Sequence, residues 1–268
     1  MISGVATRVI TCHAEQKEFM FLSKLQSTFL IWMFLFTFTI LSPAVAGQFG
    51  VSPIRIDLDR GARSGAITVS NDEDAEPLRV QLRLFEWTQD AVGKDDYQLK
   101  EDLLYFPRLM VLEKGEQKLI RVGSRMPAPE REKTYRLFIE ELPAPPTPGG
   151  ARVGVSVRFG VPIFVAPVKT DLRGEIEKFS VDKGFLRIGV RNRGNVQFTI
   201  KSITATSGEA FSKEVDGWYL LNGVAREHSI EIPSQVCTQL KQIEIVVKTD
   251  PPLELKKTLS VNASMCGA

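Results

Sequence analysis

The chain has 268 residues, of which 34 are basic, 32 are acidic and two are histidines, so its formal net charge at pH 7 is +2. This near balance gives no electrostatic footprint for nucleic acid or for a membrane surface. The sequence has no Gly-rich phosphate loop, G-x-S-x-G elbow, H-E-x-x-H motif or metal-spaced Cys/His cluster, so we expect neither an enzyme nor a cofactor or metal site.

The N-terminal segment predicts export from the cytoplasm. Lys24 precedes the almost wholly apolar run Phe29–Leu41, and an A-x-A site follows at residues 44–46. A basic flank, a short apolar core and such a site are typical of a cleaved signal peptide, and the run is shorter than the roughly 20 residues of a transmembrane helix. We therefore expect residues 1–46 to be a signal peptide, with Met20 as an alternative start, and the mature chain to have no stable membrane anchor. An uncleaved N-terminal anchor is the alternative.

Residues 47–167 are predicted to form a first β domain. Short segments of alternating apolar and polar residues are separated by clusters of Gly, Pro, Asn and Asp, without a helical repeat of apolar residues. Short strands at this spacing are typical of an immunoglobulin-like sandwich. The predicted strand segments are 49–58, 66–71, 78–87, 96–106, 117–123, 134–143 and 150–167.

The last of these segments, GARVGVSVRFGVPIFVAP, is unusually long for one strand. Every odd position from Val153 to Val165 is apolar, whereas the even positions up to Gly160 are small or polar. At about 3.3 Å per residue, the alternating stretch would span roughly 40 Å, about twice the usual strand. Its two ends therefore need different packing partners, unless it is a long core strand with an exposed hairpin end.

Residues 168–268 are predicted to form a second sandwich. The polar stretch VKTDLRGE, residues 168–175, is typical of a linker, and the strand pattern then restarts. The sequence thus predicts an all-β protein with two immunoglobulin-like β-sandwich domains in tandem. The predicted strand segments of the second domain are 176–181, 185–192, 196–206, 218–223, 228–233, 241–249 and 256–262.

Two cysteines remain once the predicted signal peptide, which contains Cys12, is removed. An even pair in an exported protein predicts a disulfide between Cys237 and Cys266. On the loop-entropy model this bond would contribute roughly 3–4 kcal/mol to stability. Two buried thiols are the alternative.

Several segments together resemble the PapD-like periplasmic chaperones of the chaperone–usher pathway, which assemble pili and related surface fibres. VSPIRIDLDRGARSGAITVSN resembles that family's opening strand, turn and second strand, and YFPRLMVLEKGEQKLIRV resembles its Pro-containing strand, Gly turn and Q-x-x-R-V strand. TYRLFIEELP resembles the strand before the long donated strand, and VRNRGNVQF resembles the Asn-containing turn of the second domain. The match covers most of residues 48–262 and is strongest in the first domain.

The resemblance implies a periplasmic chaperone that folds and caps fimbrial or pilus subunits and delivers them to an outer-membrane usher. In donor-strand complementation, the last strand of the first domain lends hydrogen bonds and apolar side chains to a subunit that lacks its final strand. Val153, Val155 and Val157 match the donated positions, and Phe159 extends the set, whereas the strand from Val161 onward is expected in the chaperone's own core. The implied partners are the subunits and the usher, with no nucleic acid and no cofactor.

The resemblance also implies an anchor for the C-terminal carboxylate of the subunit, made by two basic residues. Arg55 matches the first of them. The second falls at Pro162, which carries no charge, donates no ladder hydrogen bond and marks the strand as a sheet edge. Arg136, on the preceding strand, is the first candidate to replace it, and Arg158, which shares strand parity with position 162, is the second. Arg55 and Arg158 can also be ordinary exposed strand residues.

Two other functions stay open on the sequence alone. One is a secreted two-domain module that binds a protein or a glycan through its loops, without donating a strand. The other is a structural component of the fibre itself. A fibre subunit carries an N-terminal donor segment and lacks a closing strand, whereas both domains here have a full set of predicted strands.

Overall fold

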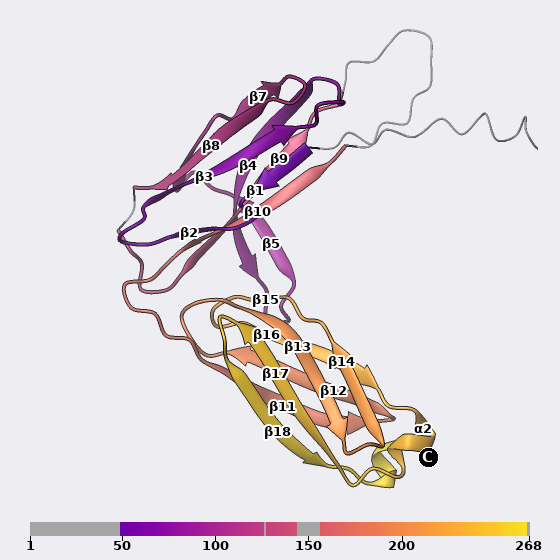
Figure 1. Ribbon diagram of the computed structural model, residues 1–268. Helices are drawn as coiled ribbons and strands as arrows, with labels where there is room; N and C mark the ends of the chain where they lie inside the picture. The colour runs from indigo at the N-terminus through magenta and orange to yellow at the C-terminus, as the bar shows by residue number, and fades with distance from the viewer. Residues whose placement is uncertain (1–48, 126, 144–155, 267–268) are drawn as a thin grey trace, which may run out of the picture. The chain divides into compact units, whose positions relative to one another are not determined.

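The computed structural model describes residues 49–125, 127–143 and 156–266, and within these ranges the regular secondary structure is almost entirely β-strand (Figure 1). Strands β1 to β10 form one sandwich, and β11 to β18 form a second sandwich later in the sequence. The predicted fold class, two immunoglobulin-like β-sandwich domains in tandem, is confirmed. The predicted signal peptide lies outside the described residues.

The first sandwich consists of a four-stranded sheet and a six-stranded sheet. The four-stranded sheet has the order β1 (Phe49–Ser52), β3 (Ser64–Asn71), β8 (Gln117–Ser124), β6 (Leu103–Phe106). The six-stranded sheet has the order β2 (Ile56–Leu58), β10 (Arg158–Val165), β9 (Lys133–Glu141), β4 (Leu78–Gln89), β5 (Asp95–Leu99), and β7 (Leu109–Leu112) also pairs with β4.

The core between these sheets follows from the alternation of residues in β4 and β9. In β4, Val80 and Leu82 are buried, whereas Gln81 between them faces outward, as the sequence predicted. In β9, Tyr135 and Leu137 also belong to the core. Arg136, between them, therefore lies on the outer face of the six-stranded sheet.

The second half of β10 belongs to this core as well. Val161, Ile163 and Val165 are between 0% and 5% exposed, which confirms the expectation for the strand from Val161 onward. Phe164, of the opposite parity, is 2% exposed and contacts other apolar residues on the outer face. This end of β10 is thus buried on both faces, as a strand inside a covered sheet is.

Two predicted strands of the first domain are wrong in extent. The segment 49–58 is not one strand, because Pro53 interrupts it: β1 pairs with β3 in one sheet, and β2 pairs in parallel with β10 in the other. Proline cannot donate to a ladder, so a change of sheet at this position costs no hydrogen bond. The segment 96–106 likewise contains two strands, β5 and β6, which belong to different sheets.

The second sandwich consists of a three-stranded sheet and a five-stranded sheet. The three-stranded sheet has the order β11 (Gly174–Asp182), β12 (Phe185–Asn192), β16 (Ala225–Glu231). The five-stranded sheet has the order β14 (Phe211–Val215), β13 (Phe198–Ser207), β17 (Gln242–Asp250), β18 (Glu254–Ser260), and β15 (Tyr219–Leu220) also pairs with β13.

A buried asparagine organises a turn in each sandwich. Asn71 ends β3, and its side-chain amide donates to the Glu76 carbonyl at 3.0 Å. Asn192 ends β12, and its amide donates to the carbonyls of Val196 and Leu220 at 2.7 and 2.9 Å. These bonds satisfy backbone carbonyls that the turns would otherwise leave buried and unpaired.

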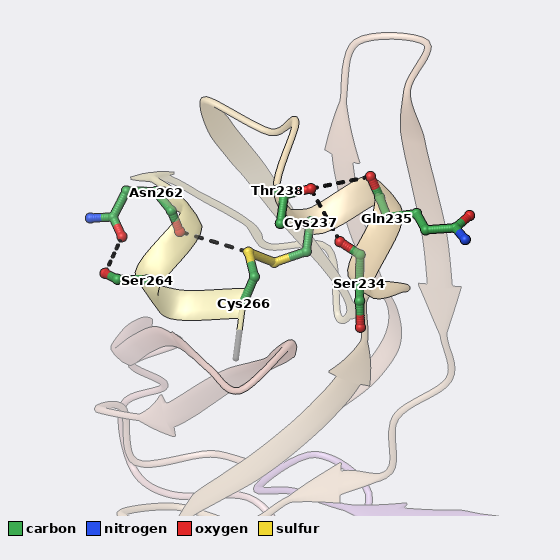
Figure 2. The surroundings of a disulfide bond; sticks show 7 residues. All are labelled: Ser234, Gln235, Cys237, Thr238, Asn262, Ser264 and Cys266. Carbon is green, nitrogen blue, oxygen red and sulfur yellow. Dashed lines mark hydrogen bonds between the residues drawn. A yellow bond between two sulfur atoms is a disulfide. The ribbon is translucent and has the colours of Figure 1, made fainter. Parts of the chain in front are cut away.

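The predicted disulfide between Cys237 and Cys266 is confirmed (Figure 2). It joins the short helix α2 (Ser234–Cys237) to the 3-10 helix η1 (Ala263–Cys266), and both cysteines are buried in the core of the second sandwich. The bond thus ties the segment before β17 to the segment after β18. Within the described ranges, no helix is long and apolar enough to cross a membrane.

Removal of the disulfide should destabilise the second sandwich. In the variant Cys237→Ala/Cys266→Ala, the unfolded chain regains the freedom of a loop whose ends are 29 residues apart. We expect a loss of roughly 3–4 kcal/mol in the free energy of unfolding, measured by urea titration of the oxidised proteins. Wild type with a reductant should lose a similar amount, and the variant should not respond to the reductant. Equal stability of the variant and the oxidised wild type would contradict this prediction.

Candidate functional site

Strand β10 is paired on both edges at one end and on a single edge at the other. Over its whole length, Arg158–Val165, it pairs antiparallel with β9. Its other edge pairs with β2 only over Ile163–Val165. In the part of the chain that the structure describes, no strand covers this edge between Arg158 and Pro162. Pro162 predicted that β10 is an edge strand. This prediction is confirmed between Arg158 and Pro162 and is wrong for Ile163–Val165, where β2 pairs with β10.

The backbone groups at the free edge belong to the even-numbered residues of β10. The Glu141 amide donates to the Val157 carbonyl at 3.0 Å, so the odd-numbered residues direct their backbone groups toward β9. Residues 158, 160 and 162 therefore direct theirs away from β9, toward the uncovered edge. Pro162 has no N–H to present there, so a ladder built on this edge loses its donor at that residue.

The donated positions are only partly within the described residues. Val157 and Phe159 are half-buried and pack against the core of the first sandwich. The Phe159 ring meets Phe49 edge-on, with 5.0 Å between the ring centroids. Val153 and Val155 lie outside the described residues. In this structure Phe159 has a partner in its own domain, and its donation to a subunit stays a prediction.

Arg136 lies directly opposite Pro162 in the ladder between β9 and β10. Its side chain is 7% exposed, and its guanidinium carbon lies 4.0 Å from the ring centroid of Trp87. Nη1 donates to the Gly160 carbonyl at 3.0 Å, whereas the buried Nε and Nη2 have no hydrogen-bond partner among the described residues. The first candidate to replace the charge missing at position 162 is thus a buried cation with two unused donors, an arrangement that needs an explanation.

Gly160 allows Arg136 to reach the uncovered edge of β10. A Cβ at this position would lie 3.2 Å from Arg136 Cδ and 3.0 Å from a ring carbon of Phe138. Because the Gly160 carbonyl points toward the free edge, the hydrogen bond from Nη1 places the guanidinium close to that edge. The positive charge of Arg136 therefore lies close to the part of the edge where Pro162 lacks an N–H donor.

Aromatic rings surround this guanidinium. Phe85 is the cross-strand neighbour of Arg136 on β4, and the ring centroid of Tyr219 lies 5.8 Å from the guanidinium carbon. Burial raises the pKa of the Tyr97 hydroxyl, as does Asp95, whereas the charge and the side chain of Arg136 lower this pKa, so the hydroxyl lies beside the cation. In such a poorly hydrated environment, an arriving carboxylate is attracted more strongly than in water.

Arg55 differs from Arg136 because its charge is already paired. Its Nε contacts both carboxylate oxygens of Asp57, at 3.0 and 2.8 Å, and its Nη2 donates to one of them at 2.8 Å. The guanidinium also stacks on the ring of Phe164, 4.6 Å from the centroid. A ligand carboxylate at Arg55 would therefore compete with Asp57.

Arg158 is exposed and stacks on Phe138, with 3.7 Å between its guanidinium carbon and the ring centroid. Its cross-strand neighbour Glu140 is bound instead by Arg83, at 2.5 Å. The structure thus brings Arg55 and Arg136 to one aromatic cluster. Arg158 lies away from this cluster, four residues before Pro162 on β10.

Sequence reasoning missed the aromatic cluster that holds these two arginines. Trp87, Phe164 and Leu221 are buried together, with Arg136 stacked on Trp87 and Arg55 on Phe164. A signal was present, because Trp87 and Phe164 are large apolar residues at positions whose parity predicts an outward direction. Their partner Leu221, in the second sandwich, has no such signal.

Comparison with known proteins finds a family for the first sandwich. Residues 48–171 match the family described as pili and flagellar-assembly chaperone, PapD N-terminal domain. Residues 48–171, which contain the first sandwich, belong to this domain family. The chain is similar to a probable fimbrial chaperone, LpfB, of Escherichia coli O157:H7, with 23% identity over 176 residues that make up 64% of this chain and 71% of the relative.

Solved structures share this PapD-like fold. A chaperone–tip adhesion subunit pre-assembly complex, CsuC–CsuE, from the archaic chaperone–usher Csu pili of Acinetobacter baumannii matches with a TM-score of 0.55 and 18% identity, over 78% of this chain and 98% of that chain. The SafA pilin in complex with the SafB chaperone from Salmonella enterica matches with a TM-score of 0.53 and 20% identity, over 80% and 97%. The low identities fit a divergent member of the family.

Glu132, which precedes β9 by one residue, joins the two sandwiches of this PapD-like chain. Its carboxylate accepts the backbone N–H of Gln197 at 2.9 Å, and its own N–H donates to the Asn195 carbonyl at 2.9 Å. Burial raises the pKa of Glu132 to about 7, although the Gln197 bond and the charge of Arg55 lower it, and Asp57 raises it further. The carboxyl group of Glu132, at the contact between the two sandwiches, therefore ionises only around neutral pH.

Glu132→Gln should remove a pH dependence of stability. The pKa is raised on folding, so the unfolded chain loses this proton first, and stability falls as pH rises from about 4.5 to about 7. We expect Glu132→Gln to unfold like wild type at pH 4.5 and to be more stable at pH 8, by on the order of 2 kcal/mol. Urea titrations at both pH values measure this. The exposed Glu130→Gln serves as control, and an equal response of both variants would contradict the prediction.

Proposed function

We propose that the chain is a periplasmic chaperone that folds and caps fimbrial or pilus subunits and delivers them to an outer-membrane usher by donor-strand complementation. The observation that carries this proposal is the buried guanidinium of Arg136. It has two unused donors, lies opposite Pro162 and borders the uncovered edge of β10. The match of residues 48–171 to the PapD-like chaperones supports the same function.

The uncovered edge supplies the hydrogen bonds of strand donation. An incoming strand would pair with the free backbone groups of residues 158 to 162, while the apolar residues of the same strand fill the open groove of the subunit. Val153, Val155 and Val157 remain the proposed donors, with Phe159 as an extension that would exchange its contact with Phe49 for one with the subunit. Each buried Val contributes about 1.5–3 kcal/mol before ordering costs.

Arg136 is the proposed anchor for the C-terminal carboxylate of the subunit. Nε and Nη2 lie on one side of the planar guanidinium and fit the two oxygens of a carboxylate. An incoming strand finds no N–H donor at Pro162, so we expect its pairing to end there. Its C-terminal carboxylate then lies beside the guanidinium of Arg136. Both nitrogens are buried in the free chain, so capture requires the carboxylate to displace part of the surrounding side chains.

The remaining parts of the proposal concern location and partners. The predicted signal peptide and the confirmed disulfide fit an exported protein that works in an oxidising compartment. Solved relatives with the same fold include a pilin in complex with its chaperone and a chaperone–tip adhesion subunit complex, which supports fibre subunits as partners. Delivery to an usher is proposed because the second of these relatives comes from a chaperone–usher pathway.

A charge in the donor stretch should abolish subunit capture. In Val155→Asp, a carboxylate would have to enter the apolar groove of the subunit, which costs several kcal/mol unless it is protonated. We expect the recovery of a co-expressed fimbrial subunit as a soluble complex to fall by at least about tenfold. Leu119→Asp, which puts the same charge at an exposed apolar residue of β8 in the other sheet, is the matched control. Intact capture by Val155→Asp would favour a binding module that does not donate a strand.

Loss of the Arg136 charge should weaken capture, and a charge restored across the ladder should rescue it. Arg136→Ala removes up to two charge-assisted hydrogen bonds, so we expect about 10- to 100-fold weaker affinity for a subunit with a free C-terminus. In Arg136→Ala/Pro162→Lys, a cation on the facing residue should restore part of the affinity. Arg55→Ala should have a smaller effect, because Arg55 is already paired with Asp57. Unchanged affinity of a folded Arg136→Ala protein would remove Arg136 from the proposal.

A further inference from the structure

The outer face of the six-stranded sheet carries a second feature beside the uncovered edge of β10. The ring of Phe138 on β9 packs edge-on against Phe85 and Tyr97, each with 5.4 Å between the centroids. Arg158 of β10 covers the same ring at 3.7 Å and is itself exposed. One side of the Arg158 guanidinium is thus fixed on Phe138, while the rest of the group remains accessible to solvent.

The rings hold Arg158 in place without pairing its charge. Its cross-strand neighbour, Glu140, is bound by Arg83, and no salt bridge joins Arg158 to a described carboxylate. Between Arg158 and Pro162, Gly160 presents no side chain on this face. An exposed planar cation, stacked on Phe138, therefore lies at the start of the edge that a partner strand would pair with.

A strand added to this edge must place side chains on both faces of the extended sheet. Side chains of a β-strand point alternately to the two faces of the sheet. Half of the partner's side chains therefore lie on the inner face, and the other half lie on the outer face, next to Arg158 or Gly160. Directly adjacent residues on paired strands have Cβ atoms about 4.5–5.5 Å apart. The outward-facing residue beside Arg158 can therefore stack directly on the guanidinium.

The position of that residue follows from the proposed anchor, on which this inference rests. If the carboxylate lies at Arg136, opposite Pro162, the partner strand ends at the Pro162 end of β10. Arg158 lies four residues, or about 13 Å, before Pro162 along the strand. The residue beside Arg158 is then about four residues before the C-terminal residue of the subunit.

We propose that Arg158, held by Phe138, is a specificity-determining subsite for an outward-facing aromatic side chain near the C-terminus of the subunit. A guanidinium between two aromatic rings gains stacking and cation–π attraction on both sides. A lysine or arginine at the same place of the partner meets a like charge instead. This role differs from the carboxylate anchor for which the sequence made Arg158 a candidate.

Synthetic peptides with a free C-terminus test the subsite directly. The probes are labelled peptides of alternating Val and Ser that carry Phe, Ala or Lys at the fourth position before the last residue, and binding to the mature chaperone is measured by fluorescence anisotropy. The Phe peptide should bind about three- to tenfold more tightly than the Ala peptide, and the Lys peptide should bind more weakly than both.

Variants then assign the preference to Arg158. Arg158→Ala should bind the Phe and Ala peptides equally. Arg158→Lys, which keeps the charge but lacks the planar guanidinium, should recover little of the preference for Phe. Phe138→Leu, which removes the supporting ring, should reduce it. Arg121→Ala, an exposed arginine on β8 of the other sheet, should retain it. A full preference for Phe in Arg158→Ala would overturn the proposal.

Peptides with an amidated C-terminus separate the subsite from the anchor. If Arg158 stacks on a side chain, amidation weakens all peptides but leaves the preference for Phe intact, which supports the proposal. If the preference disappears on amidation, Arg158 acts through the carboxylate, and the proposal is overturned. Equal affinity of wild type for amidated and free peptides would contradict the Arg136 anchor instead, and a persisting Phe preference would still support the subsite.

Discussion

The hydrogen bonds between β9 and β10 extend along the whole of β10, and they hold this strand in register while its other edge stays uncovered from Arg158 to Pro162. An uncovered sheet edge is normally an aggregation hazard, which proteins avoid by covering or charging it. Here β2 covers the end that belongs to the core, and the other end carries an exposed arginine and a proline. The strand can therefore be rigid and free to pair at the same time, and both the proposed donor function and the position of its charges depend on this asymmetry.

The same asymmetry explains why a buried cation is tolerated in the first sandwich. Burial of an arginine with two unused donors costs free energy that the single bond to Gly160 and the contact with Trp87 offset only in part. Retention of such a group makes physical sense where a ligand supplies the missing acceptor. By contrast, Arg55 has its acceptor in Asp57, and Arg158 is exposed to water, so neither of them carries the same cost.

Much of this could be predicted from the sequence, because strand alternation depends on neighbouring residues alone. The two sandwiches, the burial of Val161 onward and the disulfide all follow from local pattern or from cysteine number. The change of sheet at Pro53 could not be read from the apolar pattern, which continues across it. The pairing of Arg136 with Pro162 was equally hidden, because residues 142–157 separate the two strands and leave the register undetermined. Trp87 and Phe164 broke the alternation visibly, but their common partner Leu221 lies in another domain.

The loss of a basic residue at position 162 need not mean the loss of an anchor, because neighbours across an antiparallel ladder share one face and lie about 5 Å apart. A charge can therefore move from β10 to β9 and still reach the same point, provided that nothing stands between. Gly160 meets this condition, since a Cβ there would crowd both Arg136 and Phe138. Proline adds something that a lysine at the same place would not, because it ends the row of donors at the free edge. In the proposed function, Pro162 marks where a paired strand stops, and Arg136 supplies the charge that the terminal carboxylate of that strand would meet.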